Sequence, residues 1–164
     1  MSLHSLTAAL LFCWLMTAVR CSSEYAALWT DDDGDTGPLS AACMRCICET
    51  TTGVSVPAGG ALFNISYTYW AYAFGISGSE QRDEYNACVS SPWCAARTVQ
   101  HNMRLFLPEC VRRSPQRAPC ETALALHTFG AQAACLRELD VGVRTRLRTC
   151  LDRQVQQWLT TNVN

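Results

Sequence analysis

The stretch C-M-R-C-I-C-E at residues 43–49 places three cysteines within six positions. In a chain of 164 residues with 11 cysteines, such a density is typical of a small secreted domain whose fold is held by disulfides. Zinc is the other common reason for a C-x-x-C pair, but no second tight pair of Cys or His completes a tetrahedral site. The motif therefore predicts a disulfide framework, with no metal and no cofactor.

An apolar run extends from Leu6 to Val19, interrupted only by Thr7 and Thr17. A helix that crosses a bilayer needs about 20 apolar residues, so this run is too short to span one. Its length suits the central region of a signal peptide. We therefore expect residues 1–22 to be a signal peptide, the protein to be secreted and extracellular, and no membrane span to follow.

Removal of that leader would take Cys13 and Cys21 with it and leave nine cysteines. An odd number in a secreted domain leaves one thiol free or in an intermolecular bond. The nine are Cys43, Cys46, Cys48, Cys88, Cys94, Cys110, Cys120, Cys135 and Cys150.

The charges are unevenly distributed. Residues 23–86 hold nine acids against two arginines, whereas residues 87–164 hold ten arginines against five acids. A balance of this kind gives no strong case for nucleic-acid binding. Residues 23–39 are predicted to be an acidic N-terminal tail. Asp31–Asp35 resembles the start of a calcium loop, but the closing glutamate is missing, so we interpret it as a solvated linker.

Helix signals begin at Ser40, which can cap a helix that runs through Ile47. Residues 61–73 are apolar and aromatic and could form a buried helix or a strand. Ser91-Pro92 is a typical helix start, and we expect Pro108 to end that helix.

Two more helices are expected in the second half of the chain. Pro119 can open the first, and Gly130 can close it. The last helix is amphipathic, because apolar residues recur along one face at helical spacing from Val143 to Trp158. The pattern predicts a mainly α, small disulfide-rich domain.

Five motifs in order resemble the invertebrate-type lysozymes, a destabilase-like family, and match its insect branch best. The resemblance covers residues 40–151, and it implies a lysozyme-like domain over 40–152, followed by the end of the C-terminal helix and a tail at 153–164. The motifs are C-x-x-C-I-C-E at 43–49, L-F-x-I at 62–65 with Y-W at 69–70, C-A-x-x-T-V-Q at 94–100 with Met103, L-H at 126–127 with Gly130, and C-x-x-E-L with C-L at 135–151.

The resemblance implies hydrolysis of the β-1,4 link between N-acetylmuramic acid and N-acetylglucosamine in peptidoglycan. Glycoside hydrolysis usually needs two carboxyl groups beside the bond. By this resemblance the catalytic glutamate falls at Thr51, and the aspartate falls in a loop that is shortened here to residues 54–59 without an acid. Glu49 is the remaining candidate. Two residues along a helix correspond to about 200° of rotation, so Glu49 would face nearly away from Thr51.

Two hypotheses on function follow. The first is a secreted lysozyme-family protein, serving antibacterial defence or digestion, that is catalytically degenerate. The second is a non-catalytic secreted module that binds a glycan or a protein on the same scaffold. Peptidoglycan or another glycan is the expected partner under the first hypothesis, and the sequence does not fix an oligomeric state.

The resemblance also assigns roles to cysteines and to one histidine. The family's equivalent of Cys48 bonds a cysteine six residues later, which is Val54 here. We therefore expect Cys48 to be the free thiol and the other eight cysteines to form four bridges. His127 matches a histidine that some members pair with a serine to cleave isopeptide bonds, but that serine belongs to the shortened loop.

Aromatic side chains gather shortly after the L-F-x-I motif. Tyr67, Tyr69 and Trp70 are candidate glycan contacts, because aromatic rings combine apolar area with a polar handle; core packing is the alternative. Asn64 begins the sequon N-I-S, a possible glycosylation site. The resemblance places it near the cleft, where we expect burial to limit its use.

Overall fold

The computed structural model describes residues 19–21, 37–52, 55–56, 62–78 and 80–162, and it confirms a mainly helical domain. A two-stranded antiparallel sheet pairs β1 (Val19–Arg20) with β2 (Ser55–Val56). The described helices are α2 (Ala41–Thr52), the 3-10 turn η2 (Leu62–Asn64), α3 (Tyr67–Ala73), α4 (Arg82–Ser90), α5 (Pro92–Arg113), α6 (Pro119–Phe129), α7 (Ala131–Ala134) and α8 (Val141–Asn162).

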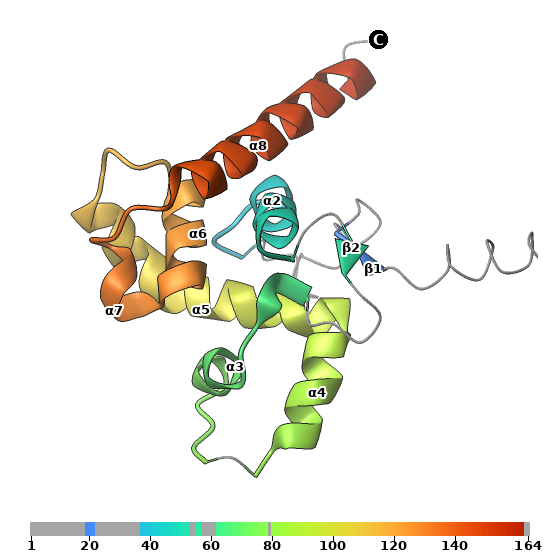
Figure 1. Ribbon diagram of the computed structural model, residues 1–164, viewed down its shortest axis with the longest axis vertical. Coiled ribbons are helices and arrows are strands. Elements are labelled where there is room, and N and C mark those ends of the chain that lie inside the picture. Colours follow the sequence, from blue (N-terminus) through green and yellow to red (C-terminus); the bar gives the residue numbers. More distant parts are fainter. Residues whose placement is uncertain (1–18, 22–36, 53–54, 57–61, 79, 163–164) are drawn as a thin grey trace, which may run out of the picture.

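Helix α2 lies between α8 and the long helix α5 (Figure 1). Its buried residues recur at helical spacing and include Met44 and Ile47, both fully buried. Helix α5 packs on α6 on one side and on α3 and α4 on the other. The core therefore forms around α2 and α5, and α8 extends beyond it.

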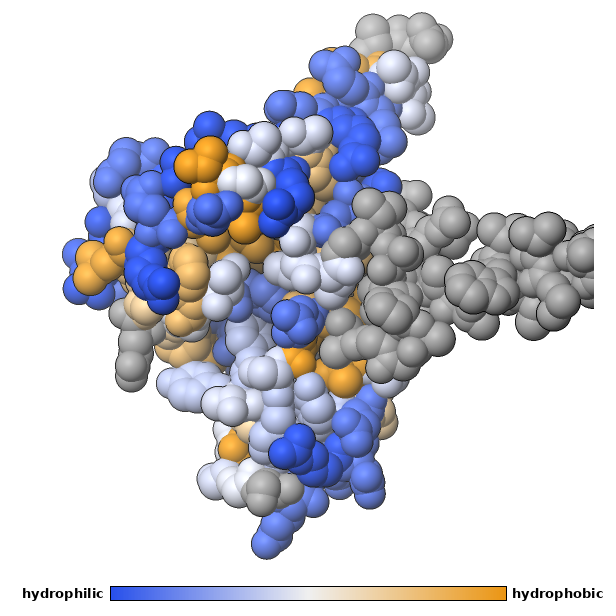
Figure 2. Space-filling model, viewed as in Figure 1, coloured by the Kyte–Doolittle hydropathy of each residue, from blue (hydrophilic) through white to orange (hydrophobic). Residues whose placement is uncertain are grey.

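The projecting part of α8 is largely hydrophilic on the face shown in Figure 2. Val155, Trp158 and Leu159 are nevertheless exposed on it. Among the residues that the structure describes, no helix is both long and apolar enough to cross a membrane.

Eight of the nine cysteines expected to survive leader removal form four bridges that tie the helices together. Two of these bridges start on α2, one bridge joins α4 to α5, and one joins α5 to the segment after α7. The pairs are Cys43–Cys120, Cys46–Cys150, Cys88–Cys94 and Cys110–Cys135.

Cys48 is also bridged, to Cys21. The prediction that Cys48 is a free thiol is therefore wrong for the chain that the structure describes. It failed because Cys21 had been assigned to the leader. Cys21 instead follows β1, and the pairing of Val19 with Val56 and Arg20 with Ser55 brings it to the end of α2.

The structure also corrects some of the expected helix ends and settles the open segment. α2 continues past Ile47 to Thr52, and the described part of the open segment, residues 62–73, contains a 3-10 turn and a helix rather than a strand. Pro108 does not end α5, which continues to Arg113. A proline removes only one N–H from the helix ladder, and the basic residues of the last turn suit the helix dipole.

Candidate functional site

Two adjoining hollows of about 430 and 360 Å³ lie between α2, η2, α3, α5 and α6, with one lining residue each from α7 and α8. They share Ser66, Tyr69, His127 and Thr128. We call the two together the cleft. Its size is in the range usual for small-ligand sites. The remaining lining residues are Thr50, Thr51, Asn64, Thr68, Tyr72, Asn102, Met103, Phe106, Leu124, Leu126, Phe129, Gly130, Ala131 and Val143.

No Asp, Glu, Lys or Arg is among the described residues that line the cleft. Its polar groups are hydroxyls, amides and one imidazole. The surroundings can therefore donate and accept hydrogen bonds, but they supply no carboxyl group to protonate a leaving oxygen or to stabilise a positive charge.

Thr51 lies where the resemblance places the catalytic glutamate, and it lines the cleft. Its hydroxyl donates to the backbone oxygen of Ile47 at 2.9 Å. Thr50 and Thr52 make the same kind of bond one turn back along the helix, each at 2.6 Å. The end of α2 thus presents side chains whose protons are already engaged with their own helix.

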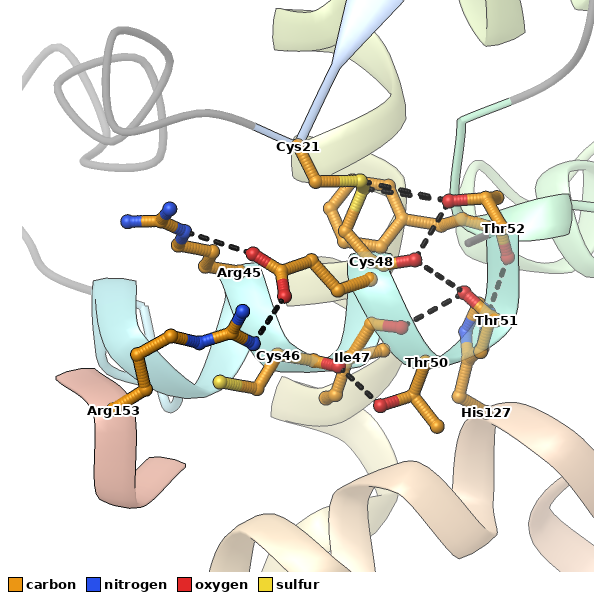
Figure 3. Close-up of a disulfide and its surroundings, with 12 residues drawn as sticks. Cys21, Arg45, Cys46, Ile47, Cys48, Thr50, Thr51, Thr52, His127 and Arg153 are labelled. Carbon is orange, nitrogen blue, oxygen red and sulfur yellow. Dashed lines mark hydrogen bonds and ion pairs between the residues drawn. A yellow bond between two sulfur atoms is a disulfide. The ribbon is translucent and has the colours of Figure 1, made fainter. Parts of the chain in front are cut away.

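Glu49 does not reach the cleft. Its side chain is only 10% exposed and forms ion pairs with Arg45 at 3.1 Å and with Arg153 of α8 at 2.9 Å. Figure 3 shows these two arginines on the opposite side of the view from Thr51 and His127. The carboxylate is therefore a structural link between α2 and α8, and its direction agrees with the rotation expected for two helical residues.

His127 comes from α6 and holds the turn η2. Its Nε2 lies 2.6 Å from the backbone oxygen of Phe63, and a carbonyl can only accept, so Nε2 carries the proton. Phe63 has φ +60°, a left-handed conformation that is costly for a bulky residue. The imidazole thus stabilises a strained turn that forms one wall of the cleft.

Two buried polar atoms of the cleft residues, Nδ1 of His127 and the hydroxyl of Tyr69, have no hydrogen-bond partner among the residues that the structure describes. The two rings meet edge to face with centroids 5.0 Å apart. Burial lowers the pKa of His127 and raises the pKa of Tyr69, so both groups are neutral at pH 7. Two residues that line the cleft therefore each carry a buried polar atom that is uncharged and has no partner among the described residues.

The aromatic residues divide between the cleft and the core. Tyr69 lines the cleft, but Trp70 is buried, with only 4% of it exposed. Tyr67 packs on Trp70 and donates its hydroxyl to the backbone oxygen of Gly78. Trp70 thus belongs to the core, which argues against a glycan contact there. Tyr67 is half-buried, packs against the core and is not among the residues that line the cleft, so its glycan contact stays a prediction. Helix register explains the position of Trp70, because Trp70 is next to Tyr69 and points about 100° away from it.

Three further residues contribute to the cleft: Tyr72, which belongs to the aromatic cluster of the sequence, and Asn102 and Phe106, which sequence reasoning missed. Tyr72 on α3 is 61% exposed, and its ring lies 5.5 Å from that of Phe106 on α5. Asn102 donates to the backbone oxygen of Tyr69 and so ties α5 to α3. The i, i+3 spacing of Tyr69 and Tyr72 was the available signal for one shared face.

Asn64 is exposed on the cleft wall, so the expectation that burial limits its use is wrong. It is the last residue of η2 and has φ +51°. The hydroxyl of Ser66, the third residue of the sequon, accepts a hydrogen bond from the backbone N–H of Tyr69 and caps α3.

Within the described part of the chain, no group of three or more His, Cys, Asp or Glu side chains could hold a metal ion. Comparison with known families finds one match, to the family described as Destabilase, over residues 40–150. No curated protein and no solved structure matches the chain.

Proposed function

The chain belongs to the Destabilase family, that of the invertebrate-type lysozymes, and from this premise we propose that it is a secreted member that binds a glycan without hydrolysing it. The observation that carries the proposal is the cleft without a carboxyl group around Thr51. A glycosidase of the usual kind needs one carboxylic acid as proton donor and a second carboxylate as nucleophile or base.

Other acids do not replace the missing pair. Glu49 is held by two arginines outside the cleft. Asp83 and Glu84 lie in the first turn of α4, are exposed, and are not among the lining residues. Among the described residues, none of these acids is therefore placed to act as a general acid near Thr51.

The cleft is lined by polar and aromatic side chains of the kinds that bind sugars. Tyr69 and His127 line the cleft, and each carries a buried polar atom, a hydroxyl and an acceptor nitrogen, that no described residue pairs with. A sugar hydroxyl or acetamido group inserted between these side chains would supply the missing partners. Tyr72 and Phe106 add apolar area beside them. A neutral stretch of N-acetylated glycan suits this combination, and peptidoglycan supplies it.

Retention on peptidoglycan tests the proposal. The wild-type protein should co-sediment with insoluble peptidoglycan. Tyr69→Phe keeps the ring and removes only its buried, unpaired hydroxyl, so it should weaken binding roughly fivefold, about 1 kcal/mol for one hydrogen bond. Tyr67→Phe is the matched control, because its hydroxyl bonds Gly78 outside the cleft. The proposal fails if the wild type is not retained, or if the two variants bind alike.

A further inference from the structure

The bridge between Cys21 and Cys48 bears on where the leader is removed. Cys48 lies on the buried side of α2 and is 1% exposed, and Cys21 is 4% exposed. Among the cysteines that the structure describes, the other eight are already paired with one another. Cys21 is thus the partner available to Cys48 within the described residues, and it occupies a place in the core.

A second contact holds the same short segment. The two residues before Cys21 form β1, which pairs antiparallel with β2, with Val19 opposite Val56 and Arg20 opposite Ser55. Backbone pairing and the bridge are separate attachments, and both fall on residues 19–21. A cut after Cys21 would remove both.

The segment also supports the end of α2 next to the cleft. Figure 3 shows Cys21 joined to Cys48, with Thr52 beside the bridge. Thr52 Oγ1 lies 3.5 Å from the sulfur of Cys21 and 3.7 Å from that of Cys48. Because Thr51 directly precedes Thr52 in α2, the bridge lies beside the part of α2 that lines the cleft.

We propose that the secreted protein retains Cys21 bridged to Cys48, and that the leader is cut between Ala18 and Val19. Ala18 is a small residue near the end of the apolar run and would be the last residue of the leader. Met16 stands where an A-x-A-like site has its other small residue. This position moves the cut from the C-terminal side of residue 22 to the N-terminal side of β1. It also accounts for every cysteine of the mature chain, from Cys21 to Cys150, in five bridges.

Two covalent steps are implied. Water adds across the Ala18–Val19 peptide bond, which leaves a carboxylate on Ala18 and a new ammonium on Val19. The thiols of Cys21 and Cys48 then lose two protons and two electrons to a protein disulfide donor of the secretory pathway, and one sulfur–sulfur bond forms.

The test is to express the full precursor in a secreting eukaryotic host and to analyse the protein from the medium. Amino-terminal sequencing and intact mass should place Val19 first. Alkylation of the denatured, unreduced protein should label no cysteine. A chain that begins at Ser22 or later, or label on Cys48 of the wild type, would overturn the proposal.

Two variants complete the design. Cys21→Ser should leave one labelled cysteine, Cys48, and lower the melting temperature by about 5 to 10 °C, since a closed loop of 27 residues is opened. Cys13→Ser is the matched control, because Cys13 leaves with the leader, and it should change neither label nor melting temperature. Equal melting temperatures for the two variants would contradict a structural bridge. None of these measurements depends on glycan binding, so they fail or succeed separately from the proposed function.

Discussion

At the scale of single residues, position along a helix decides what a carboxylate can do. Glu49 and Thr51 stand two residues apart on α2, and they serve different parts of the molecule. Glu49 links α2 to α8 through Arg153, whereas Thr51 faces the cleft. A glutamate close in sequence to a catalytic position is therefore no substitute for one at that position.

Glu49→Gln should lower stability rather than any lytic activity. Glutamine keeps the shape but removes the charge that neutralises the half-buried Arg45, so we expect a loss of about 1–2 kcal/mol in the free energy of unfolding by urea titration. Glu109→Gln is the control, because Glu109 forms an exposed pair with Arg112, and it should leave the urea midpoint unchanged. Equal midpoints for both variants would show that Glu49 has no structural role.

His127 should make stability depend on pH. Burial lowers its pKa in the folded protein, so below the usual histidine value of about 6.5 the unfolded chain binds a proton that the folded protein does not. The contribution of His127 to stability is then present above pH 6.5 and is lost as the pH falls. The urea midpoint should drop between pH 7.5 and pH 5.5, and the drop should be smaller in His127→Gln. A larger drop in the variant would contradict this.

Asn64 should carry a glycan when the protein is made in a glycosylating host. The side chain is exposed at the end of a turn and begins an N-I-S sequon. Because it lines the cleft, the glycan should also reduce retention on peptidoglycan. Treatment with an N-glycosidase should lower the mass and raise retention, with Asn64→Gln as the matched control. An unmodified Asn64 peptide from such a host would refute the first expectation.

Residue roles were predictable from sequence where they depend on local geometry alone. The direction of Glu49 relative to Thr51 follows from the helical repeat. The core position of Trp70, the exposure of Asn64 and the partner of Cys48 depend on which distant segments pack nearby. Trp70 lies against Tyr85 of α4, and Cys21 is 27 residues from Cys48, so neither outcome was contained in the local pattern.

At the scale of elements, the bridges should contribute unequally to stability. In a chain-entropy description the contribution grows with the length of the closed loop. Cys46–Cys150 joins residues 104 apart, and Cys88–Cys94 joins residues six apart. Replacing the first pair by alanines should lower the free energy of unfolding by about 4–5 kcal/mol, and replacing the second pair should lower it by about 2 kcal/mol. Equal losses of unfolding free energy for the two pairs, measured with urea, would show that native-state strain or residual structure in the unfolded chain sets the contribution of a bridge, and that loop length does not.

Helix starts were easier to predict than helix ends. Ser91 accepts from the N–H of Cys94, and Pro119 opens α6, both as their residue types indicate. The predicted end of α5 at Pro108 was wrong. A proline disrupts a helix only at its own site, and tertiary packing can stabilise the turns that follow it. Cys110, beyond Pro108, is buried and bridged to Cys135, which holds the last turn in place.

At the scale of the whole molecule, the chain has the scaffold of the lysozyme family, but no carboxyl group is among the described residues that line its cleft. Two α2 bridges, the His127 contact to η2 and the packing of α5 on α3 and α6 fix the walls. The family and the helical fold were predictable from motif order, since cysteine spacing and apolar pattern determine both. The neutral lining of the cleft was only partly predictable, because it gathers residues from seven separate elements.

The most direct test of this account is clearing of a bacterial cell-wall suspension by the purified protein, beside a lysozyme of known activity. We expect no clearing by the wild type, since loss of a general acid alone costs typically 10²–10⁴-fold. Thr51→Glu should restore little, because a second carboxylate is still missing. Robust clearing by the wild type that Glu49→Gln abolishes would contradict the account and would make Glu49 the catalytic acid.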